Sequence, residues 1–173
     1  MSEICKLIEA GNPIMKVRLS GCSPDLDRDE IERKLIDSME HYQGIGLSAN
    51  QIGIMERVFV MYSDVKKQET IICFNPEITK YSDTKITMDE GCLTYPGLWL
   101  KVKRSDTIEV QYEDKTGEIQ HQSMLGLECR IFLHEYDHME GTNFTEKVSK
   151  MKLKRALRRR SKMQKKSKLV QNQ

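Results

Sequence analysis

The chain of 173 residues has no long run of apolar residues, and this absence excludes a membrane-spanning helix. Its first residues also lack the basic segment followed by an apolar segment that marks a secretory signal. The five cysteines form no close pairs, and an odd, scattered set argues against a disulfide framework. We therefore expect a protein of the reducing cytoplasm that does not enter a membrane.

Acidic residues are absent from the last part of the chain. Glu146 is the final one, and 12 of the 28 lysine and arginine residues follow it. The 26 acidic residues before that point are balanced by only 16 basic residues, so residues 1–146 carry a net charge of −10 and residues 147–173 carry +12. We expect an acidic catalytic body over residues 1–146 and a basic C-terminal helix or tail over residues 147–173.

The spacing of apolar residues predicts one helix before a region of strands. Ile31, Leu35, Ile36 and Met39 form a stripe that predicts a helix over Asp29–His41. Alternating and β-branched residues then predict five strands. These are Arg57–Tyr62, Thr70–Asn75, Thr84–Cys92, Thr107–Tyr112 and Glu118–Ser123.

Two further helices are predicted near the end of the chain. One covers Leu125–Met139 and ends at Gly141, a residue suited to a helix C-terminus, and the other runs from Glu146 to about Lys166. The Asn75-Pro76 pair is expected to form a turn. No internal repeat or long linker separates two folded domains. The order of elements predicts an α+β fold in which antiparallel β-sheets surround a central helix.

The central helix carries the sequence His134-Glu-Tyr-Asp-His138. Residues four apart share one face of a helix, so both imidazoles can reach a single metal ion. Glu135 lies beside them, about 100° further round the helix axis, where a carboxylate can act on a metal-activated water. The plain alternative is a surface helix with two solvated histidines.

Two histidines leave a catalytic metal one protein ligand short. Counting residues does not fix the third ligand, because the chain offers many carboxylates and four other cysteines. The segment Glu90-Gly-Cys-Leu-Thr94 is the best candidate: Gly91 permits a close approach of the backbone, and Cys92 can supply a thiolate. A small buried cysteine at the end of a strand is the alternative.

A third segment is Gly44-Ile-Gly-Leu-Ser-Ala-Asn-Gln51. Its glycines and small residues allow the backbone to lie against a ligand, and Gln51 offers an amide donor. A glycine-rich break after a helix is also ordinary loop chemistry. The segment lacks the spacing and the preceding strand of a dinucleotide-binding fingerprint.

Together, GIGLSANQ, EGCLT and HEYDH resemble, in order and spacing, the three motifs of the peptide deformylases. The resemblance covers roughly residues 12–148 and departs from the usual pattern at Ser48, Thr94 and Leu133, none of which is a metal ligand. It implies a metal-dependent hydrolase of protein biosynthesis. Such an enzyme works in N-terminal processing, removing the formyl group from the formyl-methionine of new polypeptides.

The resemblance also implies the metal centre. Cys92, His134 and His138 would hold one divalent metal ion per chain. Ferrous iron is the metal with which the family typically works, and zinc, nickel and cobalt can occupy the same kind of site. A Cys/His/His ligand set does not decide among these metals.

The catalytic and substrate residues follow from the same resemblance. Glu135 would transfer the proton, while the Gln51 amide and the Leu93 backbone N–H would stabilise the oxyanion. Arg104 would pair with Glu90 behind the cysteine segment, and Trp99 would lie where the substrate backbone leaves. The substrate site is expected at Ile45, Gly46, Met88, Glu90, Gly91, Leu127 and Ile131, with the edge of His134.

A metallopeptidase with an HExxH helix is the nearest alternative function. Such an enzyme takes its third ligand downstream, usually from a histidine or a glutamate. Glu140 and Glu146 are available, but no histidine follows His138. Cys92, which lies upstream, fits a deformylase better.

A nucleic-acid-binding protein with a structural metal site is the second alternative. Lys147–Lys168 contains 12 basic and no acidic residues. A basic helix beside an acidic body would be drawn to RNA phosphates, although a solvated arm is equally compatible with this composition. Some deformylases carry a basic C-terminal helix that contacts the ribosome, which this tail resembles in place and charge, so ribosomal RNA is the expected partner.

Overall fold

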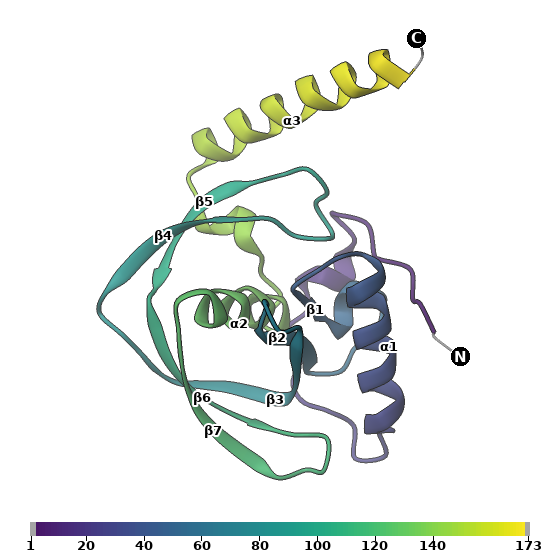
Figure 1. Ribbon diagram of the computed structural model, residues 1–173, viewed down its shortest axis with the longest axis vertical. Coiled ribbons are helices and arrows are strands. Elements are labelled where there is room, and N and C mark those ends of the chain that lie inside the picture. The colour runs from purple at the N-terminus through teal and green to yellow at the C-terminus, as the bar shows by residue number, and fades with distance from the viewer. Residues whose placement is uncertain (1–2, 172–173) are drawn as a thin grey trace.

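The computed structural model describes residues 3–171; the ends of the two predicted ranges, residues 1–2 and 172–173, lie outside the described part of the chain. A five-stranded sheet has the order β1-β2-β3-β6-β7, and β4 and β5 form a second sheet. All strand pairs are antiparallel, so the predicted α+β class is confirmed (Figure 1). The strands are β1 Gly46–Ser48, β2 Val58–Asp64, β3 Glu69–Tyr81, β4 Lys85–Glu90, β5 Leu100–Ser105, β6 Thr107–Glu113 and β7 Ile119–Leu125. The helices are α1 Arg28–His41, α2 Gly126–Met139 and α3 Lys150–Gln171, with short 3-10 helices at Pro13–Lys16, Ala49–Ile52 and Phe144–Lys147.

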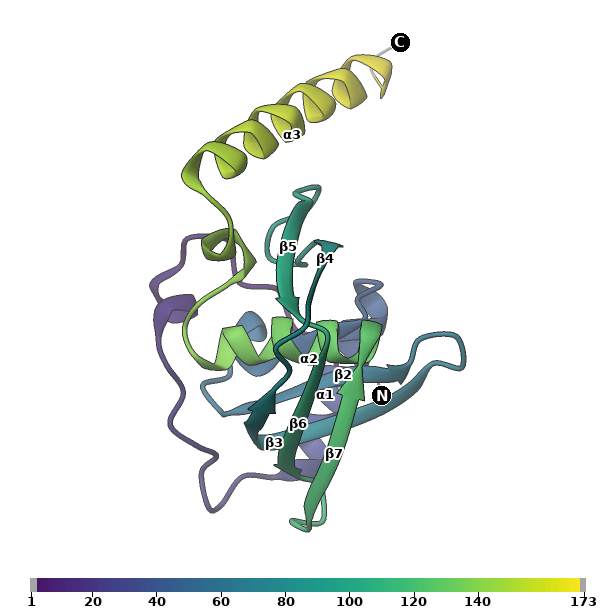
Figure 2. The same cartoon turned by 90° about the vertical axis from the view of Figure 1, so that its left-hand side faces the viewer.

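Helix α2 lies between the two sheets (Figure 2). Ten of its 14 residues are buried, and Phe132 meets Phe59 of β2 edge to face with ring centroids 5.0 Å apart. A helix buried on most sides can carry charged residues only where each finds a partner, because an unpaired buried charge is strongly destabilising. The polar residues of α2 are therefore held in specific hydrogen-bond networks.

Strand β3 continues through the Asn75-Pro76 pair, so the predicted turn is wrong at this point. The register with β6 shifts between Phe74 and Glu77, and Asn75 has a positive φ of 48°. Proline has no N–H to donate to a sheet, and a bulge places it where no such donor is needed. The signal that reads as a turn therefore marks a bulge within a long strand.

Two strands were not predicted. Strand β1 occupies three residues of the glycine-rich segment that was expected to be a loop, and pairs with β2. Strand β5 alternates inward Leu100 and Val102 with exposed Lys101 and Lys103, a short period-two pattern. Each strand pairs with its neighbour along the chain, β1 with β2 and β5 with β4, and the residue spacing within such a short segment does not reveal its partner.

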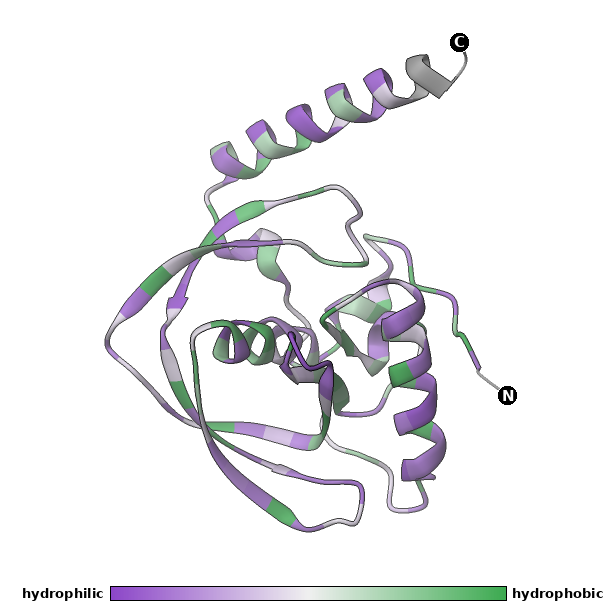
Figure 3. Cartoon of the chain, in the orientation of Figure 1, coloured by the Kyte–Doolittle hydropathy of each residue, from purple (hydrophilic) through white to green (hydrophobic). Residues whose placement is uncertain are grey.

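Helix α3 begins at Lys150, later than the predicted Glu146, because a 3-10 turn precedes it. Its first half packs on the body through Leu153, Ala156 and Arg160, which share one face, while residues 161–167 are exposed. The second half of the helix projects away from the sheets (Figure 1), and the part of it that is coloured by hydropathy in Figure 3 is mainly hydrophilic. Among residues 3–171, no helix combines the length and the apolar character that a membrane crossing requires.

Gly141 ends α2 in the left-handed conformation, with a φ of +67°, and a Cβ there would lie 2.6 Å from the Lys16 carbonyl oxygen. We expect Gly141→Ala to lower the free energy of unfolding by about 3 kcal/mol, from backbone strain and this contact together. Gly117 is the control, since its φ is +89° but a Cβ there meets no atom within 4 Å. Gly117→Ala should lose only about 1 kcal/mol in urea unfolding, and equal losses would exclude a role for the Lys16 contact.

Candidate active site

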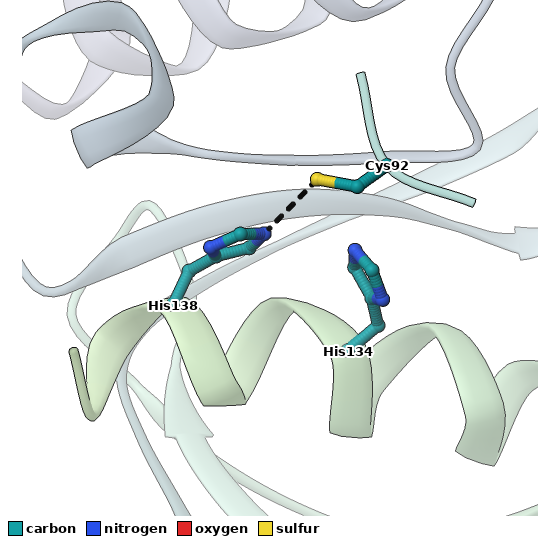
Figure 4. Close-up of side chains that lie close together, drawn as sticks. All are labelled: Cys92, His134 and His138. Carbon is teal, nitrogen blue, oxygen red and sulfur yellow. Dashed lines mark hydrogen bonds between the residues drawn. The ribbon is translucent and has the colours of Figure 1, made fainter. Parts of the chain in front are cut away.

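Cys92, His134 and His138 bring one sulfur and two imidazoles together, with ligand atoms all within 4.8 Å of one another. Figure 4 shows both imidazoles extending from α2 toward Cys92 on the facing segment between β4 and β5. The Cys92 Sγ lies 3.5 Å from the His138 Nε2. Metal–sulfur and metal–nitrogen bonds of about 2.3 and 2.1 Å place two ligand atoms roughly 3.6 Å apart in a tetrahedral site. The cluster therefore has the chemistry and nearly the dimensions of a metal centre.

His138 is completely buried, and its Nδ1 has no hydrogen-bond partner among the described residues. Burial, reinforced by the nearby His134, lowers the pKa of His138 well below its usual range. The imidazole is therefore neutral at physiological pH, which is the form that binds a metal ion.

His134 is oriented by Glu90, whose Oε2 lies 3.1 Å from the His134 Nδ1. A carboxylate is a hydrogen-bond acceptor, so Nδ1 donates to Glu90. Burial lowers the pKa of His134, but its hydrogen bonds to Cys92 and Glu90 outweigh burial and raise it, so a metal ion would take the place of the proton at Nε2. The contact with Glu90 fixes both the tautomer and the plane of the ring.

The Glu90 carboxylate is itself held by Arg104, as the sequence predicted. The Arg104 Nε and Nη2 donate to its two oxygens at 2.7 and 2.9 Å. Burial favours the neutral acid, but the hydrogen bonds from Arg104 and His134 outweigh burial and hold the pKa of Glu90 far below its usual range. The Arg104 Nη1 donates to Asp137 at 2.8 Å, and Lys147 forms an ion pair with the same aspartate.

Glu135 points from α2 toward the glycine-rich segment. Its Oε2 is buried without a hydrogen-bond partner, and burial raises its pKa to about 7. A Cβ on Gly46 would lie 2.6 Å from the Glu135 Oε1, so only glycine leaves room for this carboxylate. A carboxyl group with a pKa near neutrality can both accept and return a proton.

Gln51 is held by residues of two motifs. The backbone N–H and the hydroxyl of Ser48 both donate to its Oε1, at 3.0 and 2.9 Å. Its Nε2 consequently faces the cysteine segment, 3.1 Å from the Thr94 hydroxyl and 3.3 Å from the Cys92 sulfur. Ser48 and Thr94, two departures from the family pattern, thus orient the amide that the sequence proposed as a donor.

A cavity of about 350 Å³ opens beside these groups. Most residues predicted for the site line it: Ile45, Gly46, Gln51, Glu90, Gly91, Cys92, Leu93, Leu127, Ile131, His134 and Glu135. His138 and Arg104 lie behind this lining. Trp99 contributes to the mouth of the cavity, with its side chain 66% exposed and its ring 3.2 Å from the position of a Cβ on Gly91.

Met88 was predicted to be a pocket wall, but it lies on β4 outside the cavity lining. Arg130 from α2 lines the cavity and donates to the carbonyls of Ile86 and Val102, the latter directly opposite Met88. The Arg130 side chain therefore fills the space between α2 and this part of β4.

Arg130 and Asn50 are site residues that the sequence reasoning missed. The Asn50 Nδ2 donates to the His138 carbonyl at 2.9 Å and ties the glycine-rich segment to α2. Arg130 precedes His134 by four residues and so shares its helix face. A lone charge within the apolar run Cys129–Leu133 was the available signal for it.

This fold, with a Cys/His/His cluster beside a buried glutamate, defines a hydrolase of the metal-dependent class. The family profile described as Polypeptide deformylase matches residues 4–154, and the chain belongs to this family. Its members are hydrolases that remove the N-formyl group from newly made polypeptides.

Individual relatives agree with this assignment. The peptide deformylase of Thermotoga petrophila is 33% identical over 143 residues, which cover 82% of this chain and 85% of that protein. An Arabidopsis thaliana relative, named peptide deformylase 1B, chloroplastic/mitochondrial, is 34% identical over 83% of this chain and 54% of its own length. The crystal structure of a Synechococcus elongatus peptide deformylase in complex with actinonin superposes with a TM-score of 0.85 at 28% identity, covering 91% of this chain and 88% of that one.

We expect Cys92→Ala to abolish stoichiometric metal binding, because two imidazoles alone make an incomplete and weaker site. Metal content per chain, measured by atomic emission after anaerobic purification, tests this expectation. Cys5→Ala is the control. Cys5 lies outside the cluster, so this variant should keep one metal per chain. Full metal content in the Cys92 variant would remove this residue from the ligand set.

Proposed function

We propose that Cys92, His134 and His138 hold one ferrous ion, with which the chain deformylates N-formyl-methionyl nascent peptides. The convergence of these three side chains beside the cavity carries the proposal. A divalent metal held there supplies Lewis-acid activation of the attacking water. Zinc, nickel and cobalt suit the same ligands, and iron is proposed because the family typically works with it.

Glu135 is the proposed proton carrier. It lines the cavity, and its buried Oε2 has no partner among the described residues. Its carboxylate can take a proton from the attacking water and deliver it to the leaving amine, so that one group serves both halves of the reaction. The absence of a side chain at Gly46 keeps the space in front of it open.

The Gln51 amide and the Leu93 backbone N–H are the proposed donors to the oxyanion. The Gln51 Nε2 lies beside the sulfur of Cys92, and Leu93 follows that ligand directly on the cavity wall. Donors fixed before the reaction need no reorganisation when negative charge develops, and losing one typically costs about 3 kcal/mol of transition-state stabilisation.

The apolar part of the cavity is the proposed methionine pocket. Ile45, Leu127 and Ile131 supply aliphatic surface, which suits a flexible thioether side chain. Gly91 and Trp99 border the opening, where the peptide that follows the methionine would leave. We propose the cytoplasm as the place of action, since all five cysteines are free and the substrate is made there.

Hydrolysis of formyl-Met-Ala-Ser by anaerobically purified protein, with metal assayed in the same sample, tests the activity. Release of formate, with one metal per chain and no cleavage of unformylated Met-Ala-Ser, is expected. Cleavage of peptide bonds without formate release would instead identify a metallopeptidase.

We expect Glu135→Gln to lower kcat at least a hundredfold, because the amide cannot carry the proton. Metal content should remain at one per chain, since Glu135 adjoins the ligands without belonging to the cluster. Stopped-flow measurement of formate release, alongside metal analysis, checks both expectations. Turnover within threefold of the native protein would assign the proton transfer to another group.

The ribosome is the proposed partner of α3. Residues 161–167 of this helix are exposed, and the chain from Lys147 onward is basic and carries no carboxylate, while the body before it is acidic. This distribution favours a polyanion such as ribosomal RNA on the helix alone. The proposal concerns the exposed part of the helix, since Leu153 and Ala156 pack on the body.

Replacing Lys162, Lys165 and Lys166 by glutamine should weaken ribosome co-sedimentation at least tenfold at low salt. It should also flatten the dependence of log affinity on log salt by about 2, because fewer counterions are released. Hydrolysis of formyl-Met-Ala-Ser should be unchanged, as these side chains are exposed. The control removes three exposed body charges, Lys66, Lys85 and Lys103, and should retain binding. Equal binding by both triple variants would leave α3 without this role.

A further inference from the structure

Arg130 is a buried cation at the active-site cavity, with a side chain only 4% exposed. Its Nη1 donates to the Glu90 Oε1 at 2.7 Å and to the Val102 carbonyl at 2.9 Å. Its Nη2 donates to the Ile86 carbonyl at 2.9 Å. One guanidinium thus joins α2 to both strands of the smaller sheet and to the carboxylate behind the metal cluster.

Two arginines therefore share one carboxylate. The Glu90 Oε1 accepts from Arg104 and Arg130, and its Oε2 accepts from Arg104 and His134. Arg104 has a second carboxylate partner in Asp137, whereas Glu90 is the only carboxylate paired with Arg130 in the described structure. Asp137 also pairs with Lys147, so removing Arg130 would leave Glu90 with a single arginine, Arg104, which it shares with Asp137.

Arg104 meets Glu90 from β5 and is itself tied to α2 through Asp137. Its bidentate contact holds the carboxylate plane from the side of β5. Arg130 extends from α2, one helical turn before His134. Its hydrogen bond therefore fixes Glu90 relative to the helix that carries both histidine ligands. With both contacts in place, the carboxylate has one orientation relative to the His134 ring.

We propose that Arg130 is a positioning residue for the metal centre, acting through Glu90 on His134. The proposal rests on the metal role assigned above to Cys92, His134 and His138. Partners behind the ligands of a metal site typically change metal affinity or activity by 10–100-fold when they are lost. Arg130 touches neither a ligand atom of the cluster nor the proton carrier, so its effect should appear in the metal centre before it appears in substrate binding.

Arg130→Met, loaded with cobalt(II), tests the proposal. Methionine keeps an unbranched chain of similar reach and removes the three hydrogen bonds. We expect a shift of the visible cobalt absorption bands, metal affinity weakened 10–100-fold, and a kcat lowered to a similar extent. The KM for formyl-Met-Ala-Ser should stay within threefold. Arg130→Lys should recover part of the loss, because an ammonium group can still donate to Glu90.

Arg57→Met is the matched control. Arg57 is a buried arginine that also joins one carboxylate, Glu140, to backbone carbonyls, including those of Leu19 and Pro76. Arg57 precedes β2 and contacts the C-terminal end of α2 at Glu140 and Tyr136, so its loss should lower thermal stability and leave the cobalt spectrum unchanged. If Arg130→Met does not fold, the lysine variants at both positions give the same comparison.

Three results would overturn the proposal. One is a native cobalt spectrum with kcat within twofold in Arg130→Met. Another is a raised KM with unchanged kcat, which would make Arg130 only a pocket wall. The third is the same spectral shift in the Arg57 variant. The proposed function fails separately, since in that case the native chain itself would bind no metal or release no formate.

Discussion

Four hydrogen bonds converge on the buried carboxylate of Glu90, and the arrangement of the site depends on them. They join the end of β4 to β5 through Arg104, and to α2 through Arg130 and His134. Cys92 follows Glu90 by two residues, so the contacts that hold Glu90 also place the Cys92 sulfur. A charged group in this place is stable only because every one of its lone pairs is used.

The glycine-rich segment completes the site from the other side. Gln51 reaches the cysteine segment, Asn50 bonds to the carbonyl of His138, and Gly46 makes room for Glu135. Three stretches that lie far apart in the sequence are thus fixed to one another by side-chain contacts as well as by the sheet. A site held from several directions is preorganised, which is what stabilisation of a developing charge requires.

Much of the site could be predicted from the sequence because its motifs are local. The spacing of His134 and His138 places both on one helix face, and the residues around Cys92 made it the best candidate for the third ligand. The resemblance supported Cys92 and supplied the pairing of Glu90 with Arg104. Arg130 was missed because its partners come from β4 and β5, and β5 itself was not predicted. Met88, predicted as a pocket wall, lies outside the cavity lining, and Arg130 from α2 bonds to the carbonyl of Val102 opposite it.

The fold class was predicted correctly, while the details that failed depend on long-range pairing. The bulge at Asn75 exists because β3 has to pair on both edges, with β2 and with β6. The charge boundary after Glu146 likewise does not mark the end of packing, since Leu153 and Ala156 belong to a core with Leu98. Charge counts describe the solvent-facing side of a helix and say nothing of the side that is buried.

Because α3 is anchored by its first half, the residues beyond that contact continue as a strut of regular helix. Residues 161–171 extend the helix by roughly 16 Å past Arg160, at 1.5 Å per residue. If the projecting part of α3 binds a surface, the helix would hold the cavity at a fixed distance from that surface and in a fixed orientation. A domain on a flexible linker can occupy many positions within a large volume. A domain on a helical connection keeps the opening of its cavity close to one region of that surface.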